Sequence, residues 1–310
     1  MGASHVRSGT PNQDSAQAWS TAPSRGAAVV ADGHGSKSYF RSHTGSKLAV
    51  QVASLFYGRC CEEVEKLGTA AELKALLTGM ASEWGRLVDE DRHANPITEL
   101  EKEFVATKAL PESVWDKSVP ETLSRSVYGS TLVGVFAIDA MLLCFQLGDG
   151  DIVLIDRQGE LQHVDLKPVG MLGTETTSLS MSTAEQLFKT CVLAAEDIGL
   201  IFVSTDGYAN SYASDEDFLA VPRDLFGLLS QGKLDEVNGG LTEWMTDTTT
   251  QGSGDDISIA MLWNPSTPAP LREDDAFEID AAVASVAIDP ISILTTPDAL
   301  LIPEAESPDV

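Results

Sequence analysis

Residues 200–207 of the chain read Leu200-Ile201-Phe202-Val203-Ser204-Thr205-Asp206-Gly207. This apolar run of strand length, closed by an Asp-Gly turn signal, predicts a buried strand with a carboxylate at its end. Residues 27–35 repeat the design, with Asp32 and Gly33 after an apolar run. A third stretch, residues 252–256, places Asp255 and Asp256 just before an apolar run at residues 257–263. Three distant parts of the chain therefore present carboxylates at strand ends, where a fold can bring them together.

The order of the predicted elements indicates the fold class. Two segments with helical spacing of apolar residues, at 48–56 and 73–88, lie between the first and second predicted strands, and a third covers residues 225–245. Strands, then helices, then mostly strands again is an α+β order, unlike the strict alternation of a parallel sheet. We therefore predict two packed antiparallel β-sheets flanked by helices. The strands are expected at residues 27–31, 132–138, 141–147, 152–155, 191–194, 200–203 and 257–263.

The composition is that of an acidic globular protein. The 310 residues are 43% hydrophobic, which is enough apolar material for a sizeable core. The formal net charge of −27 argues against nucleic-acid binding, which needs clustered lysine and arginine. No stretch approaches the roughly 18 apolar residues of a membrane span, and no signal-peptide pattern opens the chain. We therefore expect no membrane partner and a cytoplasmic location.

The cysteines are consistent with the expected cytoplasmic location. Cys60, Cys61, Cys144 and Cys191 show no spacing that would suit a zinc site. They are expected to be buried thiols in a reducing environment.

The last part of the chain differs from the rest. From Pro265 onward it holds half of the 14 prolines, and its charged residues are almost all acidic. Proline interrupts regular structure and like charges repel. We predict one domain over residues 1–264 and an acidic, proline-rich, disordered tail over residues 265–310. An inert tether is the favoured interpretation of the tail, with docking of a basic partner or covering of a cleft as alternatives.

Carboxylates gathered at strand ends need a cation. Even at an effective dielectric constant of about 20, two like charges about 4 Å apart repel by roughly 4 kcal/mol. Oxygen ligands without a histidine or cysteine cluster favour Mg²⁺ or Mn²⁺ over zinc. Any single Asp-Gly pair is more typical of a hairpin turn or loop. The recurrence of the design favours the metal site.

Six short motifs follow one another between residues 5 and 263: Asn12-Gln13-Asp14, Asp32-Gly33-His34-Gly35, Gly129-Ser130-Thr131, Gly148-Asp149-Gly150-Asp151, Ser204-Thr205-Asp206-Gly207 and Gly254-Asp255-Asp256. In this order they resemble the metal-dependent protein serine/threonine phosphatases of the PP2C family, in a bacterial subgroup. The resemblance implies an αββα sandwich that hydrolyses phosphoserine and phosphothreonine in proteins. It also implies a phosphorylated protein substrate, with a cognate serine/threonine kinase or its targets as partners.

The resemblance further implies a ligand set. Asp32 would bridge two Mg²⁺ or Mn²⁺ ions, the Gly33 carbonyl would bind one ion, and Asp206 and Asp255 the other. A hydroxide held between the ions would attack phosphorus, and His34 would protonate the leaving oxygen. Asp32 and His34 are thus the expected catalytic residues.

Other aspartates would act without binding metal. By the same resemblance, Asp14 and Asp256 would support the ligands from outside the coordination sphere. The motif at residues 148–151 is interpreted as a tight hairpin turn, from which Asp149 would brace the metal-bearing strands.

Three positions depart from the family pattern. Gly9 stands where many members carry an arginine that grips the substrate phosphate, so Arg7 and His5 become the candidates for that role. Gln13 replaces a glutamate and removes a negative charge near the metals. Ser126 stands where some members carry an aspartate for a third ion, so we expect two ions.

Two other functions stay open at this stage. The missing arginine and glutamate permit a phosphatase-like binding or regulatory module that turns over weakly or not at all. Phosphoryl transfer through an aspartyl phosphate is the less favoured alternative, because no strand ends in the Asp-x-Asp arrangement usual for that chemistry.

Overall fold

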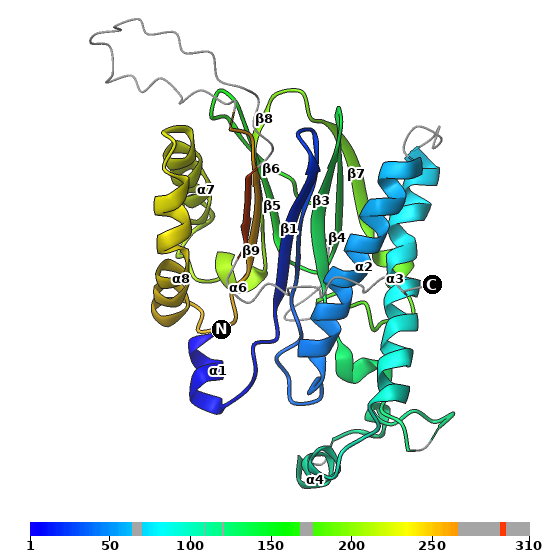
Figure 1. The fold of residues 1–310 in the computed structure, drawn as a ribbon. Helices are drawn as coiled ribbons and strands as arrows, with labels where there is room; N and C mark the ends of the chain where they lie inside the picture. Colours follow the sequence, from blue (N-terminus) through cyan, green and yellow to red (C-terminus); the bar gives the residue numbers. More distant parts are fainter. Residues whose placement is uncertain (64–69, 109, 120, 168–175, 266–291, 296–310) are drawn as a thin grey trace, which may run out of the picture.

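The computed structural model describes residues 1–63, 70–108, 110–119, 121–167, 176–265 and 292–295, and two antiparallel five-stranded sheets form its centre (Figure 1). The first sheet has the strand order β1-β2-β3-β4-β7 and the second has the order β10-β9-β8-β5-β6. The strands are β1 (Ser15–Ala22), β2 (Arg25–Ala31), β3 (Leu132–Ile138), β4 (Met141–Leu147), β5 (Asp151–Asp156), β6 (Leu161–His163), β7 (Lys189–Ala194), β8 (Ile198–Ser204), β9 (Ile259–Trp263) and β10 (Ser292–Thr295).

Helices cover the outer face of each sheet (Figure 1). The first sheet packs against α2 (Ser42–Glu63) and α3 (Ala70–Ala94), and the second against α7 (Asp215–Ser230) and α8 (Leu234–Gln251). The shorter helices are α1 (Ala3–Ser8), α4 (Glu99–Lys108), α5 (Ala184–Leu187) and α6 (Asp206–Ala209), with 3₁₀ turns at Glu112–Val114 and Arg125–Tyr128. The predicted α+β class, two packed antiparallel sheets flanked by helices, is confirmed.

The central strands are apolar throughout because both of their faces are buried. In β2, Ala27 and Val29 pack under α2 and α3, whereas Ala28 and Val30 point to the second sheet. This division follows the two-residue repeat of side chains along a strand. The same central cluster receives Val203 from β8, so it joins the two sheets into one core.

Some observed elements differ from the predicted ones. The predicted strands do not include β1, because its face toward the second sheet carries only small residues such as Ala16 and Ala18. The helical stretch predicted at 225–245 is two helices, α7 and α8. Gly232, whose φ of 74° lies in the left-handed region, separates them. The last long strand starts at Ile259, two residues later than its apolar run.

The motif at residues 148–151 is not a hairpin turn. Strand β4 belongs to the first sheet and β5 to the second, so the segment crosses from one sheet to the other. Gly148 has a φ of 124°, and a Cβ atom there would lie 2.5 Å from Cβ of Thr131. Glycine is therefore required at this crossing both for its backbone conformation and for space.

The predicted tail lies mostly outside the described residues. Of residues 265–310, the structure describes Pro265 and the four residues of β10, which pair antiparallel with β9. The domain boundary and the disorder of the tail therefore stay predictions. Among the helices of the described residues, none combines the length and hydrophobicity that crossing a membrane requires.

Candidate metal centre

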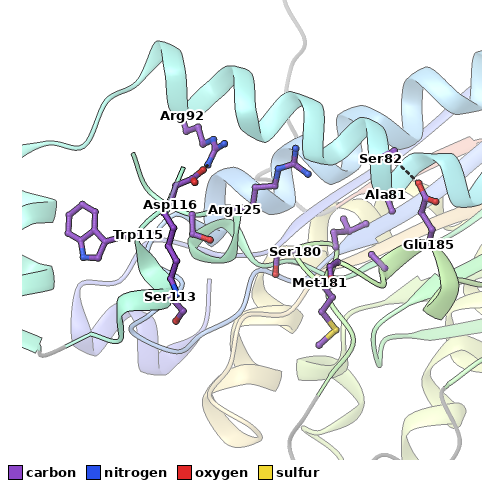
Figure 2. A pocket seen from close by; sticks show the side chains of 15 residues that line it. Ala81, Ser82, Arg92, Ser113, Trp115, Asp116, Arg125, Ser180, Met181 and Glu185 are labelled. Atoms are coloured by element: carbon purple, nitrogen blue, oxygen red, sulfur yellow. Dashed lines mark hydrogen bonds and ion pairs between the residues drawn. The ribbon is translucent and has the colours of Figure 1, made fainter. Parts of the chain in front are cut away.

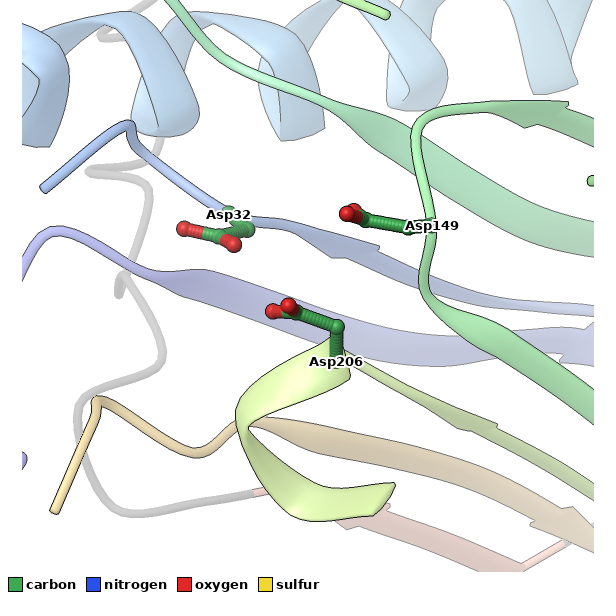
Figure 3. Close-up of side chains that lie close together, drawn as sticks. All are labelled: Asp32, Asp149 and Asp206. Carbon is green, nitrogen blue, oxygen red and sulfur yellow. The ribbon is translucent and has the colours of Figure 1, made fainter. Parts of the chain in front are cut away.

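Three aspartates meet at the ends of strands from both sheets (Figure 3). Asp32 follows β2 of the first sheet, Asp206 follows β8 of the second, and Asp149 lies in the crossing between β4 and β5. Each offers a carboxylate oxygen, and these oxygens lie within 4.8 Å of one another. The structure thus brings Asp32 and Asp206 together, and it adds Asp149 to the same cluster.

The start of β3 fixes the backbone of Asp32. Its N–H group donates a hydrogen bond to Oγ1 of Thr131 (2.9 Å), and the N–H of Thr131 donates to the carbonyl oxygen of Asp32 (2.8 Å). One residue further, Gly33 pairs with Ser130 in an antiparallel bridge. The Gly129-Ser130-Thr131 motif is therefore the backbone partner of the loop that carries the site.

Only glycine fits at position 33. A Cβ atom there would lie 2.4 Å from the carbonyl oxygen of Gln13 and 2.8 Å from that of Ser42. This close approach presses the backbone after Asp32 against the segment that carries Asp14.

The carboxylates of the cluster are not neutralised by basic side chains of the described residues. No lysine, arginine or histidine in that part of the chain forms an ion pair with Asp32, Asp149 or Asp206. Burial, together with the charges of Asp14 and Asp206, raises the pKa of Asp32 well above its usual value. Burial and the charge of Asp149 likewise raise the pKa of Asp206. Carboxyl groups this close favour a shared proton or a bound cation.

Asp14 ties the N-terminal segment to this cluster. It is buried, and it accepts a hydrogen bond of 2.7 Å from Oγ1 of Thr205, the residue before Asp206. Its side chain also contacts Asp32. Burial and the charge of Asp256 raise the pKa of Asp14 well above the usual value for an aspartate.

The two aspartates before β9 have different surroundings. Asp255 is exposed, and its charge contributes to the raised pKa values of all three carboxyl groups discussed above. Asp256 is buried and accepts hydrogen bonds from the backbone N–H groups of Gly2 and Gln13, the latter at 2.7 Å. Asp255 therefore faces the cluster, whereas Asp256 holds the N-terminal segment in place.

The two candidates for a phosphate contact also differ. Nδ1 of His5 lies 2.7 Å from a carboxylate oxygen of Asp256, and the His5 side chain is only 12% exposed. Arg7 is exposed on α1 and has no ion-pair partner within the described part of the chain. A hydrogen bond of 2.9 Å from Ser4 N–H to Gly254 O holds α1 against the loop that carries Asp255. Arg7 is thus the candidate with an uncommitted guanidinium group.

His34 lies beside the cluster. Its backbone N–H donates to the carbonyl oxygen of Gly129 (3.1 Å), and its ring packs edge-on against Tyr39 with centroids 4.8 Å apart. Burial lowers the pKa of His34, and the nearby charge of Asp149 acts in the opposite direction. The ring is therefore held in one place, close to Asp149.

A buried arginine, Arg41, holds the segment that precedes Gly129. Arg41 donates to both carboxylate oxygens of Glu101 (2.6 and 2.8 Å) and to the hydroxyl oxygen of Tyr128 (2.7 Å). Tyr128 directly precedes Gly129, whose carbonyl group holds His34. The sequence does not indicate this network, because Arg41, Glu101 and Tyr128 are far apart in the chain.

The donor set fits a hard divalent cation. Within the described part of the chain, the cluster offers three carboxylates and no histidine or cysteine ligand, as Mg²⁺ and Mn²⁺ prefer. Nearby, Gln13 donates from Nε2 to Oγ of Ser42 (2.6 Å), while its buried Oε1 has no hydrogen-bond partner among the described residues. An unpartnered buried oxygen beside the cluster can accept a hydrogen bond from a water on the ion.

A polar cleft of about 530 Å³ lies beside α3, and the residues that line it do not include the aspartates of the cluster (Figure 2). Its one backbone link to the site described above is Leu179, a lining residue whose N–H donates to the carbonyl oxygen of Ser130 (2.8 Å), the residue that pairs with Gly33. Hydroxyl groups and charges of both signs line the cleft, among them Arg92, Ser113, Asp116, Arg125, Ser180 and Glu185.

Comparisons with known proteins give one family and several similar structures. The model of the family described as protein phosphatase 2C matches residues 1–246. Among solved structures, a bacterial serine phosphatase is 11% identical, with a TM-score of 0.48, over 81% of this chain and 91% of that one. The serine/threonine phosphatase of S. agalactiae is 16% identical, with a TM-score of 0.47, over 81% and 93% of the two chains. The catalytic domain of the phosphatase PstP in complex with two manganese ions is 16% identical, with a TM-score of 0.46, over 81% and 90%.

A search of curated proteins gives no significant match. The family match alone covers more than half of the residues. The chain therefore belongs to the protein phosphatase 2C family.

Proposed function

We propose that the cluster of Asp32, Asp149 and Asp206 is the catalytic metal centre of this chain. Its family makes the protein a metal-dependent serine/threonine phosphatase that uses Mg²⁺ or Mn²⁺. The observation that carries the proposal for these residues is their geometry: three strand-end carboxylates lie within 4.8 Å of one another. No side-chain cation of the described residues neutralises them.

The proposed ligand set uses both sheets. Asp32, Asp149 and Asp206 would hold the ions together with Asp255 and the carbonyl group of Gly33. When bound, the ions supply a hydroxide nucleophile at neutral pH and offset the charge on the phosphoryl group. Asp32 and Asp206 directly follow sheet strands, so the sheets fix their positions more precisely than flexible loops would.

The other residues position the ligands and the substrate. Asp14 braces Asp32 through their contact, and Asp256 holds the segment on which Asp14 lies. His34 is proposed to protonate the leaving serine or threonine oxygen. Arg7 is proposed to contact the substrate phosphate, because its guanidinium group has no competing ion pair within the described residues.

The substrate is a phosphorylated protein, and we propose that its polypeptide lies along the cleft lined by Leu179, whose backbone is hydrogen-bonded to Ser130. The hydroxyl groups and charges of both signs in the cleft suit the polar segments in which phosphorylated residues occur. A cognate serine/threonine kinase or one of its targets remains the proposed partner. The family assignment does not favour the alternative of an inactive binding module.

Turnover of a phosphothreonine peptide and of an aryl phosphate, each with and without Mn²⁺, tests this function. We expect metal-dependent release of phosphate from both, and its loss in the Asp32→Asn variant. No turnover of either substrate under conditions where calorimetry shows bound Mn²⁺ would contradict the proposal. Turnover that persists after chelation would contradict the metal assignment.

A further inference from the structure

Two cysteines lie directly opposite each other in the first sheet. Cys144 of β4 is the register partner of Cys191 of β7, the strand at the edge of that sheet. Both side chains contribute to the apolar cluster between the sheets, and their thiol groups are in hydrogen-bond contact. Opposed residues of antiparallel strands have Cα atoms about 4.5–5.5 Å apart. Disulfide-linked cysteines have Cα atoms about 4.4–6.8 Å apart, so a bond requires no large backbone movement.

The two thiols differ in exposure and in chemistry. Cys144 is fully buried, whereas Cys191 is partly exposed. The hydrogen bond between them lowers the pKa of Cys191 to about 7 and raises the pKa of Cys144. Because the thiolate is the nucleophile, Cys191 is the group that an oxidant in solution reaches first and reacts with first.

We propose that Cys191 and Cys144 form a reversible dithiol oxidation site that reacts with hydroperoxides. The Cys191 thiolate attacks one peroxide oxygen, which breaks the O–O bond, leaves Cys191 as a sulfenic acid and releases hydroxide. The Cys144 thiol then attacks the Cys191 sulfur, so that the S–S bond forms and the sulfenic oxygen leaves as water. Two thiols are oxidised, and one hydroperoxide is reduced. The site does not depend on the phosphatase mechanism.

The remaining cysteines supply an internal control. Cys60 and Cys61 are neighbours on α2, where consecutive side chains point about 100° apart around the helix. Burial is the main cause that raises the pKa of Cys60 to about 12. This pair should therefore stay reduced when Cys144 and Cys191 react. All four cysteines are free thiols in the structure, although only Cys60 and Cys144 are buried as the sequence predicts.

The bond would tie the edge strand to the strand that leads to the metal centre. Strand β4 ends at Leu147, and Asp149 follows two residues later. A crosslink between residues 144 and 191 also closes a long loop, which restricts the unfolded chain.

The test treats the reduced full-length protein with hydrogen peroxide and maps its peptides without a reductant. We expect one linked pair, Cys144 with Cys191, in a monomer, a Tm higher by roughly 5 °C, and reversal by dithiothreitol. The variant Cys144→Ser should retain a dimedone-reactive sulfenic acid on Cys191, and Cys191→Ser should leave Cys144 unlabelled. Cys60→Ser is the matched control and should behave as the wild type.

Alkylation of the wild-type protein supplies a test that needs no variant. Cys191 should react faster with iodoacetamide than Cys60 and Cys144, with a half-maximal rate near pH 7 as the lowered pKa implies. Four free thiols after peroxide treatment, a bond between two molecules, or preferential linkage of Cys60 or Cys61 would each overturn the proposal.

Discussion

The carboxylate oxygens of Asp32 and Asp206 lie within 4.8 Å of each other although the two residues follow strands of different sheets. Burial and the neighbouring negative charges raise the pKa of both carboxyl groups. A divalent ion that binds both carboxylates should offset their repulsion. Metal binding is therefore expected to stabilise the junction of the two sheets.

Asp206→Asn separates metal binding from folding. The amide removes a negative charge from a crowded acidic cluster, so the metal-free variant should be at least as stable as the wild type. The rise in Tm that Mn²⁺ produces in the wild type should disappear, and kcat should fall by about a hundredfold or more. Thermal melts with and without Mn²⁺, together with calorimetric titration, measure both effects.

The control for this variant is Asp247→Asn, which removes an exposed carboxylate of α8 that is not part of the acidic cluster. It should keep wild-type metal binding and activity. Near-normal activity in Asp206→Asn would show that the metal assignment is wrong.

Asp149→Asn and Asp255→Asn should differ in their effect on metal affinity. The carboxylate of Asp149 lies in the cluster with Asp32 and Asp206, whereas Asp255 is exposed at the edge of the site. We expect Asp149→Asn to weaken the tighter of two Mn²⁺ binding steps, and Asp255→Asn to weaken mainly the other. Calorimetric titration resolves the two steps. Equal loss of the tighter step in both variants would contradict the assignment.

The sequence predicts the central strands well because their local pattern and their final environment agree. Strands β3 and β4 have the predicted bounds, since their residues are apolar on both faces and both faces are buried. Strand β1 was missed because alanines on its inner face carry little hydrophobic signal. The elements that can be predicted from sequence are those in which nearly every residue is apolar and buried.

The sequence predicts only those residues of the site that directly follow a recognisable strand. Asp32 and Asp206 follow buried strands, and their meeting could be expected from any fold that stacks those strands. The position of Asp149 depends on β4 and β5 lying in different sheets, which a Gly-Asp-Gly-Asp turn signal does not reveal. The same limit applies to Asp255 and Asp256, because adjacent residues point in different directions and the local sequence does not say which one is buried.

Asp256→Ala should destabilise the protein by about 2–4 kcal/mol in urea unfolding. The buried carboxylate accepts hydrogen bonds from the N–H groups of Gly2 and Gln13, and each donor left unpartnered costs about 1–3 kcal/mol. Asp255→Ala is the matched neighbour, and its stability should be unchanged or higher because it removes an exposed charge that repels the cluster. Equal losses in the two variants would argue against the anchoring role of Asp256.

Arg41→Met should destabilise the protein by about 3–5 kcal/mol, because it leaves Glu101 half-buried without its partner. Burial alone would raise the pKa of Glu101, but hydrogen bonds from Arg41 and Thr98 outweigh it, and the net pKa is lowered. A lowered carboxyl pKa contributes stability above the unfolded value of about 4.3 and loses it as the pH falls through the folded value. The difference in the free energy of unfolding between wild type and Glu101→Gln should therefore be constant above about pH 5 and shrink in acid. Urea titrations from pH 3 to pH 7, on the order of one every half unit, measure this dependence. A difference that grows as the pH falls would contradict the assigned pair.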